Sequence, residues 1–512
     1  MEQNTPIYAL SDERNVPSVD GCETAYKTFI KEYPQYQLTW AIDALRRTDF
    51  ARIDSSQETY VDYMGGCVYP ASLVRVHADF LQLNVLGNTH SVNNSSQLSS
   101  RHANEARQAV LDFFNAPPGY VVVFTQNASG ALKLVGESFP FRQGSNFILS
   151  ADSHNSVHGI RKFAEAGNAQ VHYIEATNEG GCHPAHAMVA LNELSPPDAN
   201  APPSLFALTA QSNITNTKNP LSLIEFAQNR GFSTLLDAAA LVPTSTFSLT
   251  EHPVDAMAVS FYKMFGFPTG IGALIAKKSF LAKLERPWFA GGTVDVVQAP
   301  GAIARLSEVV HERFEDGTIN YTSMPAITNG LHFLSAYLPF LPIRLSALTR
   351  YLIASLEALR HDTTGTPVVR VLSRRPKKAV KTIGQQSDTG STVSLLFLDP
   401  HGTMIPNSFI EHAAAAHRIS LRTGCMCNPG GAAAMLDLRA AMAALPADAT
   451  LRALEARVGR ELGVVRVSLG LASDFRDAWR VVAFARGVGS EAARGRMWSA
   501  WVAAKVEGQG AR

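Results

Sequence analysis

The stretch VSFYKMFGFPTGIGALIAKK spans residues 259–278 and joins two apolar, strand-like runs through a loop rich in glycine and aromatic residues. One lysine, Lys263, lies where the first run gives way to this loop. Most lysines at such joints are ordinary exposed cations. The alternative is an amine in a partly desolvated site, where it loses its proton more readily and can form an imine with an aldehyde. The rest of the sequence decides between the two.

Short apolar runs alternate with helix-like segments between about residue 118 and residue 277. This alternation predicts βα units, and therefore an α/β fold with a mostly parallel sheet. Residues 93–115 and 128–139 have helical spacing of apolar positions and are expected to flank that sheet. The expected strands are GYVVVFT (119–125), NFILSA (146–151), AQVHYIE (169–175), SLFALTA (204–210), FSTLLDAAA (232–240), VDAMAVS (254–260) and IGALIAKK (271–278).

The character of the sequence changes after about residue 330. Residues 329–361 read as one or two long helices, and VSLLFLD (393–399) and VVRVSLGLA (464–472) read as strands of a smaller α+β lobe. Residues 430–462, rich in Ala, Leu and Arg, predict helices or an insertion. The last twenty or so residues are expected to form a frayed tail.

Composition excludes several classes of function. Lys+Arg 45 against Asp+Glu 44 gives a net charge of +1, and the short RRPKK run at 374–378 is typical of a solvated loop, so we expect no nucleic-acid binding. The sequence has no charge-free run of about 18 apolar residues, so we expect no membrane span. The N-terminus, MEQNTPIYALSDERN, lacks the pattern of a secretory signal. Five scattered cysteines are too few for a disulfide framework. These features favour a reducing, cytoplasmic compartment.

Two further features lie at expected strand ends. The segment VVVFTQNASGALKLVGESF (121–139) predicts a strand, a turn of small residues and a helix. The free backbone N–H groups at the start of this helix would point toward one place, an arrangement that binds phosphate. More often, such a joint is only a capped helix. Asp237 ends the apolar run STLLD, where a buried carboxylate needs a partner. That partner is either an arginine or backbone amides, or the pyridinium nitrogen of a cofactor.

The order of these features favours pyridoxal 5'-phosphate (PLP). A phosphate-binding joint, an aspartate at one strand end and a lysine at the next would supply an anchor for the phosphate of PLP, a counter-charge for its ring nitrogen and an amine for its aldehyde. Lys263 is therefore predicted to be the amine presented to the cofactor rather than a surface cation.

The sequence also resembles a known family. It is similar to the fold-type I, class V aminotransferase group, and most closely to the cysteine-desulfurase-like N-terminal domain of the eukaryotic molybdenum cofactor sulfurases. The resemblance covers roughly residues 60–330 and 365–485. Its most specific motifs are SFYKMFGFPTG (260–270) and RTGCMCNPG (422–430), and it includes YVDYMGGCVYP (60–70), VFTQNASGALKLVGESFPF (123–141), DSHNSVHGIR (152–161), QSNITNTKNPLS (211–222) and LLDAAALVPTSTFSL (235–249).

The resemblance implies a division of the chain. We expect an N-terminal segment at 1–55 that contributes to the small domain, a large PLP-binding domain at 56–330, a small C-terminal domain at 331–490 and a tail at 491–512. It also implies a homodimer, the commonest closed symmetry of such enzymes. No metal is expected.

The resemblance further implies residue roles. Lys263 would form the Schiff base with PLP, Asp237 would pair with the pyridinium nitrogen, and His154 would stack on the ring. The phosphate would be held by Ala128, Ser129 and Ser260, and by Thr293, which would reach the site of the partner subunit. The substrate would be held by His90, Asn213, Arg422 and Arg466, the last with a guanidinium suited to a bidentate grip on its carboxylate.

Cys427 falls on the catalytic cysteine of the resembled family. Its thiolate would attack the sulfur of L-cysteine, leave a persulfide on the protein and release alanine, and we expect it on a mobile loop near an arginine. For the C-x-C pair with Cys425, half a metal site or two inert thiols remain alternatives. A sulfur-acceptor protein or cofactor would take the sulfur.

The sequence departs from the resembled family in three places. The chain ends at residue 512, so we expect no domain that binds the molybdenum cofactor; GGAAAM follows RTGCMCNP; and residues 432–462 do not match. The leading hypothesis is a cysteine desulfurase. The alternative is a stand-alone PLP-dependent C–S lyase, or a decarboxylating or C–C bond-forming enzyme of specialised metabolism. A non-catalytic scaffold is a third possibility, disfavoured because Asp237 and Lys263 are both present.

Overall fold

The computed structural model describes residues 19–198 and 200–510, so the expectation about a secretory signal at the N-terminus lies outside the described residues. Its larger lobe is built on a seven-stranded sheet of order β2-β8-β7-β6-β5-β3-β4. Strands β3 to β7 run parallel, and β8 is antiparallel to both of its neighbours. The strands are β2 (Tyr120–Thr125), β3 (Asn146–Ser150), β4 (Gln170–Ile174), β5 (Leu205–Thr209), β6 (Ser233–Asp237), β7 (Ala256–Ser260) and β8 (Gly272–Lys277).

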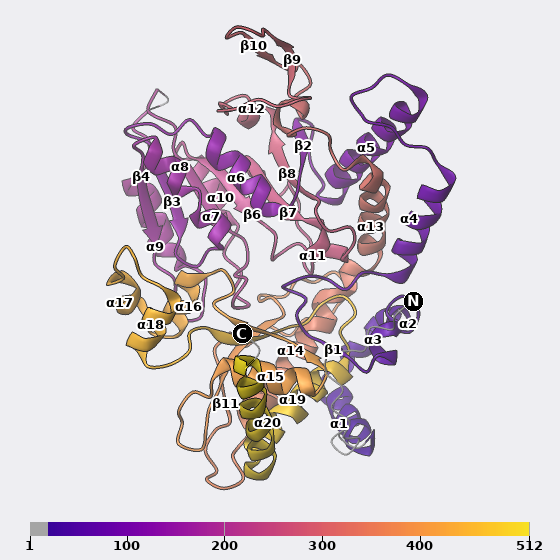
Figure 1. Cartoon of the computed structure of the whole chain (residues 1–512), viewed down its shortest axis with the longest axis vertical. Helices are drawn as coiled ribbons and strands as arrows, with labels where there is room; N and C mark the ends of the chain where they lie inside the picture. The colour runs from indigo at the N-terminus through magenta and orange to yellow at the C-terminus, as the bar shows by residue number, and fades with distance from the viewer. Residues whose placement is uncertain (1–18, 199, 511–512) are drawn as a thin grey trace.

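All seven strands coincide with runs predicted from the sequence, which confirms the mostly parallel sheet. Helices cover both faces (Figure 1), so the inner strands are buried on both sides and read as continuous apolar runs. Val123 packs on one face, with α6 (Ala128–Ser138), α7 (Asn155–His158), α8 (Arg161–Ala166) and α12 (Lys278–Leu281). Val122 packs on the other, with α5 (Asn94–Phe113), α9 (Pro184–Glu193), α10 (Ser222–Gln228) and α13 (Met324–Tyr337).

A smaller lobe lies below the large one in Figure 1 and contains an antiparallel sheet of order β11-β12-β15-β14. These strands are β11 (Val369–Val371), β12 (Thr392–Phe397), β14 (Arg422–Gly424) and β15 (Val464–Ser468), and β1 (Thr59–Tyr60) pairs with β13 (Ile419–Ser420) beside them. The accompanying helices are α14 (Leu341–Ala358), α15 (Asn407–Ala416) and α19 (Phe475–Gly489). The segment at 430–462 forms three short helices, α16 (Pro429–Met435), α17 (Arg439–Ala443) and α18 (Leu451–Val458).

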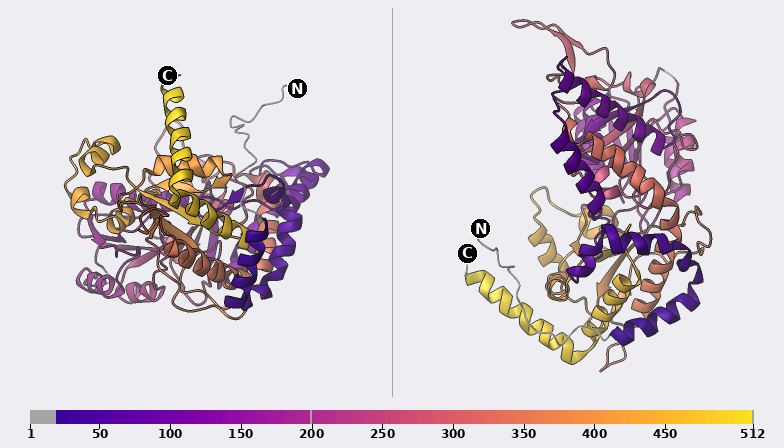
Figure 2. Two further views of the ribbon diagram at one scale, coloured as in Figure 1. Left: turned by 90° about the horizontal axis from the view of Figure 1, so that it is seen from below. Right: turned by 90° about the vertical axis from the view of Figure 1, so that its right-hand side faces the viewer.

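The end of the chain differs from the expected frayed tail. Residues Glu491–Gly510 form helix α20, which extends from the small lobe (Figure 2). Trp501 is buried and packs with Trp498 against Phe409 of α15, with ring centroids 5.7 and 5.1 Å from Phe409. This aromatic contact stabilises a helix whose own sequence has no clear apolar face.

One helical run must be considered as a candidate membrane-spanning helix. The run from Tyr321 to Ala358 is apolar and long enough to cross a bilayer by length and composition. However, 61% of its most apolar window is buried inside the molecule, which is typical of the core helices of a globular protein. We therefore assign this run to the core.

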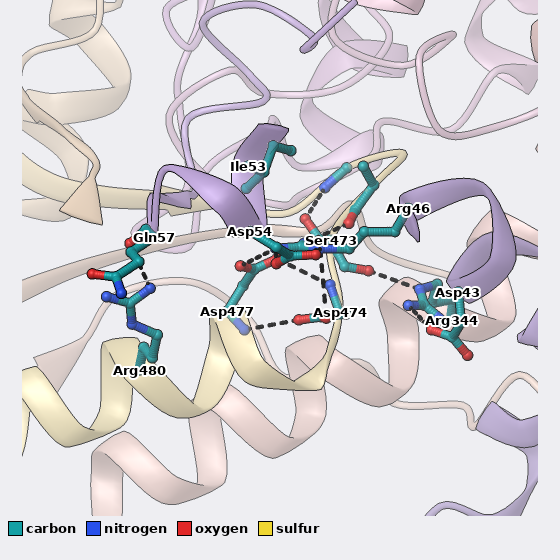
Figure 3. A network of polar contacts seen from close by, with 12 residues as sticks. Asp43, Arg46, Ile53, Asp54, Gln57, Arg344, Ser473, Asp474, Asp477 and Arg480 are labelled. Atoms are coloured by element: carbon teal, nitrogen blue, oxygen red, sulfur yellow. Dashed lines mark hydrogen bonds and ion pairs between the residues drawn. The ribbon is translucent and has the colours of Figure 1, made fainter. Parts of the chain in front are cut away.

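The N-terminal segment contains helices α1 (Val19–Glu32), α2 (Trp40–Asp49) and α3 (Ala51–Ser55). Charged residues of α2 and α3 connect it to the small lobe, as Figure 3 shows. Arg46 donates to Asp477 at 2.5 Å, to Asp54 at 2.8 Å and to the carbonyl of Ala472 at 2.7 Å. Nearby, the fully buried Arg344 donates to Asp43 at 2.5 Å. Each guanidinium therefore neutralises a carboxylate from a distant part of the chain, Asp477 for Arg46 and Asp43 for Arg344.

Replacing Arg46 with alanine should destabilise this junction. The change leaves the buried carboxylate of Asp477 without its cation, so we expect the free energy of unfolding to fall by about 3 to 5 kcal/mol. Urea unfolding followed by circular dichroism measures the change. Arg47→Ala, on the exposed face of the same helix, is the matched control and should stay within about 0.5 kcal/mol of the parent. Equal losses in the two variants would contradict the role given to Arg46.

Candidate active site

A cavity of about 110 Å³ opens at the carboxyl ends of the central strands. Parallel α/β sheets bind ligands at this edge, because loops and helix N-termini meet there. Asp237 ends β6, and Ser260 ends β7 directly before α11 (Phe261–Phe265), which carries Lys263. The lining residues include Asn127, Ala128, Ser129, His154, Ser156, Thr209, Gln211, Asn213, Asp237, Ser260, Tyr262 and Lys263. The cavity thus collects most of the residues predicted for the cofactor.

The predicted phosphate joint lies on one side of this cavity. Asn127 caps α6 by accepting a hydrogen bond from the backbone N–H of Gly130 at 3.0 Å. The N–H of Ala128 donates to Ser260 Oγ at 2.8 Å, and the hydroxyls of Ser129 and Ser156 lie 2.5 Å apart. The first turn of α6 and three hydroxyls therefore face one point, which is the donor set that a phosphate group requires.

The amine of Lys263 is buried close to the carboxylate of Asp237. Burial lowers the pKa of the Lys263 amine, and the charge of Asp237 opposes this shift, while Arg466 and Arg422 add to it. Asp237 accepts a hydrogen bond from the N–H of Ala239 at 3.1 Å and is 8% exposed. A buried amine with a lowered pKa is a better nucleophile toward an aldehyde than an exposed lysine, because more of it is unprotonated at neutral pH.

His154 lines the same cavity from the start of α7. Burial lowers the pKa of its imidazole, and Asp237 opposes the shift. Its Nδ1 accepts a hydrogen bond from the N–H of Ser156 at 3.1 Å, which sets the orientation of the ring. The ring is therefore a neutral, flat surface at neutral pH, suited to stacking on an aromatic cofactor.

His158 lies one turn further along and should make stability depend on pH. Burial lowers the pKa of His158 to about 4, below the 6.5 of an exposed histidine. The unfolded chain therefore takes up the proton first, and stability falls as the pH drops from 6.5 toward 4. We expect His158 to contribute a loss of about 1 kcal/mol between pH 7.5 and 5.5. Urea unfolding at both pH values measures it, and His158→Phe should show the smaller decline; equal declines would refute the assignment.

Arg466 of β15 is predicted to hold the carboxylate of the substrate. It is 1% exposed, donates to the carboxylate of Asp62 at 2.7 Å and to the carbonyl of Asn213 at 2.9 Å, and its Nε has no partner. Arg422 stands directly opposite on β14. Two guanidinium groups against one carboxylate leave a net positive charge beside the cavity, which favours an anionic group on a substrate.

Cys427 is exposed, and Cys425 two residues earlier is partly buried. Burial raises the pKa of Cys425, whose side chain packs in a small apolar cluster with Ile214 and Met435. The segment expected to be a mobile loop makes hydrogen bonds to the large lobe: the N–H of Asn155 donates to the carbonyl of Cys427 at 2.7 Å, and Asn213 donates to the carbonyl of Met426 at 2.7 Å. Among residues 19–198 and 200–510, no group of three or more His, Cys, Asp or Glu could hold a metal ion.

Five predicted residues do not line the cavity: besides Arg422, Arg466 and Cys427, these are His90 and Thr293. Thr293 is buried, and its hydroxyl donates to the carbonyl of Ala290 at 2.8 Å. A Cβ on the neighbouring Gly292 would lie 2.6 Å from Nε2 of His90, so His90 and Thr293 belong to one surface. This surface adjoins a projecting hairpin of β9 (Val294–Val297) and β10 (Ala304–Leu306), seen at the top of Figure 1.

Gln211 is a lining residue that the sequence reasoning missed. It is 1% exposed, and neither atom of its side-chain amide has a hydrogen-bond partner. A Cβ on Gly390 would lie 2.5 Å from its Nε2, so the lack of a side chain there makes room for this amide. An unpaired amide in a cavity fits a polar ligand. Its position directly after the expected strand at 204–210 was the signal available in the sequence.

A comparison with known families decides the identity of this site. The model of the class V aminotransferases matches residues 59–480. The chain belongs to the class V aminotransferase family. Enzymes of this family use PLP, and the cavity fits it, because it offers phosphate donors, a carboxylate, an amine and a polar group without a partner. The resemblance and the fold type inferred from the sequence are thus confirmed.

Relatives and solved structures agree with this assignment. A molybdenum cofactor sulfurase of Arabidopsis thaliana is 32% identical over 497 residues, which cover 90% of this chain and 60% of that protein. One of Bos taurus is 33% identical over 86% of this chain and 51% of its own length. The chain therefore spans about half to three-fifths of the length of these relatives. A cysteine desulfurase of Thermococcus onnurineus NA1 has a TM-score of 0.68 and 20% identity, covering 87% of this chain and 97% of its own, which shows the common fold.

Proposed function

We propose that the chain is a PLP-dependent cysteine desulfurase that breaks the C–S bond of L-cysteine and carries the sulfur as a persulfide on Cys427. The observation that carries the proposal is the meeting of two reactive groups at one place. The buried amine of Lys263 faces the cavity from the large lobe, and the exposed Cys427 is tied to Asn155, the residue after His154, from the small lobe. Relatives called molybdenum cofactor sulfurases and structural neighbours called cysteine desulfurases support it.

The residues of the chain divide the work as follows. Ala128, Ser129 and Ser260 would hold the phosphate of PLP, and Asp237 would hold its ring nitrogen. When bound, PLP supplies an electron-withdrawing ring that stabilises negative charge on the Cα of an amino acid. Lys263, freed as an amine, would take the Cα proton and return it.

Substrate binding and sulfur transfer use the opposite wall. Arg466 and Asn213 would hold the carboxylate of L-cysteine, with Arg422 and His90 near the entrance. The thiolate of Cys427 would attack the sulfur of the substrate, so that an S–S bond forms as the C–S bond breaks. The electron pair of the C–S bond stays with carbon, which takes up a proton, and alanine is released.

The partners of the chain are also proposed. Thr293 and His90 would complete the site of a second copy, which is supported by exposed apolar residues Val296, Val297 and Leu306 on the β9–β10 hairpin. A homodimer would cover them. The persulfide would pass to a sulfur acceptor, either a protein or a cofactor, in a reducing cytoplasmic compartment.

Turnover of L-cysteine tests the proposal. The purified protein, loaded with PLP, is incubated with L-cysteine and a thiol reductant, and alanine and sulfide are measured over time. We expect both products in equal amounts. Pyruvate and ammonia in place of alanine would indicate a C–S lyase, and carbon dioxide would indicate a decarboxylating enzyme, and either result would replace the proposal.

A further inference from the structure

Asp152 is a buried carboxylate between the end of β3 and the start of α7, two residues before His154. It is 0% exposed and makes no ion pair with the described part of the chain. Three donors surround it instead: Ser212 Oγ at 2.9 Å, the backbone N–H of Gly181 and the side-chain amide of Asn428. Burial raises the pKa of Asp152, and these donors oppose the shift. A buried carboxylate without a cation is costly, so a structural or functional role is expected.

Asn428, the residue that follows Cys427, is also 0% exposed. Its amide donates to Asp152 and to Asn213 Oδ1 at 2.9 Å, and its Oδ1 accepts from the N–H of Gly431 at 3.0 Å. Its own N–H donates to the carbonyl of Cys425 at 2.9 Å. The two N–H groups of this side chain therefore connect the turn at 425–428 to the large lobe, while its Oδ1 caps α16.

The backbone of this turn needs such support. Met426 and Cys427 have φ of 55° and 54°, in the left-handed region that side chains other than glycine rarely adopt. Close packing holds the residues that follow: a Cβ on Gly431 would lie 2.7 Å from Asp152 Oδ1, and one on Gly430 would collide with the carbonyl of Ala151. The turn is thus pressed directly onto residues 151 and 152.

We propose that Asp152 is a positioning residue for the thiol of Cys427, which it fixes through Asn428. The thiol is then presented from a rigid turn at the mouth of the cavity, and a sulfur acceptor has to reach Cys427 there, because the turn does not swing out to meet it. The role in sulfur transfer rests on the proposed function, whereas the rigidity of the turn does not.

Hydrogen exchange followed by mass spectrometry tests the rigidity directly. In the parent protein, the peptide that covers residues 424–431 should exchange slowly although Cys427 is exposed. In Asp152→Asn and in Asn428→Ala, exchange of this peptide should rise by about tenfold or more, because buried hydrogen bonds are lost. The matched control is Ser153→Ala, which removes the neighbouring buried hydrogen bond between Ser153 and Thr209 (2.9 Å) without touching the turn.

Fast exchange of this peptide in the parent protein, or unchanged exchange in both variants, would overturn the proposal.

Enzyme kinetics distinguish a positioning role of Asp152 from general destabilisation of the protein. In folded Asp152→Asn, the kcat for alanine should fall at least about tenfold while the KM for L-cysteine and the absorption spectrum of bound PLP stay unchanged. If the parent protein does not act on L-cysteine, the proposed function fails, while the exchange result still decides whether Asp152 fixes the turn.

Discussion

Lys263→Ala is expected to abolish the covalent attachment of PLP and to lower turnover of L-cysteine by at least about a thousandfold. Lys263 is the one amine among the residues that line the cavity, and burial has lowered its pKa. The variant loses both the nucleophile for the aldehyde of PLP and the base for the Cα proton. Borohydride reduction followed by peptide mass spectrometry measures the attachment independently of activity.

An exposed lysine away from the cavity supplies the control for this experiment. Lys278 begins α12 directly after β8, at the edge of the sheet opposite to Lys263, and Lys278→Ala should keep the attachment and the rate of the parent. Attachment of PLP to a different lysine, or a Lys263→Ala protein that retains turnover within about tenfold of the parent, would contradict the assignment.

Cys427→Ala is expected to give a protein that binds PLP normally and yet loses sulfur transfer. The residue lies outside the lining of the cavity, so the absorption spectrum of the bound cofactor should not change. Without a thiolate to accept the sulfur, formation of alanine from L-cysteine should fall by at least about a hundredfold. Chromatography of the released alanine, in the presence of a thiol reductant, measures the effect.

The other member of the C-x-C pair is the matched control. Cys425 is partly buried, and burial raises the pKa of its thiol, which makes it a poor nucleophile. Cys425→Ala should therefore retain most of the alanine formation. If Cys425→Ala lost as much activity as Cys427→Ala, both thiols would be required and the single-nucleophile account would be wrong.

Much of the large lobe could be predicted because its strands are buried on both faces. Runs such as STLLD carry no alternation of polar residues, and the glycine, proline and small residues between the runs mark where each strand stops. The ends of these strands then place Asp237 and Lys263 at one edge of the sheet. The order of these residues along the chain was therefore enough to predict a cofactor site.

The parts of the structure that could not be predicted from the sequence depend on contacts between distant segments. Asp152 and Asn428 are separated by 276 positions, and nothing local marks either as a hydrogen-bonding partner of the other. The same holds for Asp62 and Arg466, which are 404 positions apart. Helix α20 was read as a tail because its stability comes from the contact of Trp501 with Phe409 rather than from its own pattern. The hydrogen bonds that connect the Cys427 turn to the large lobe are likewise tertiary contacts.

The most direct test of the central claim is to look for the sulfur on Cys427. The PLP-loaded protein is mixed with an equal amount of L-cysteine in the absence of reductant, quenched with an alkylating reagent and digested. Mass spectrometry should find the peptide with Cys427 carrying one additional sulfur atom, removable by a thiol and absent when D-cysteine replaces L-cysteine. An unmodified Cys427 in a sample that has produced alanine, or the additional sulfur on Cys425 alone, would contradict the account.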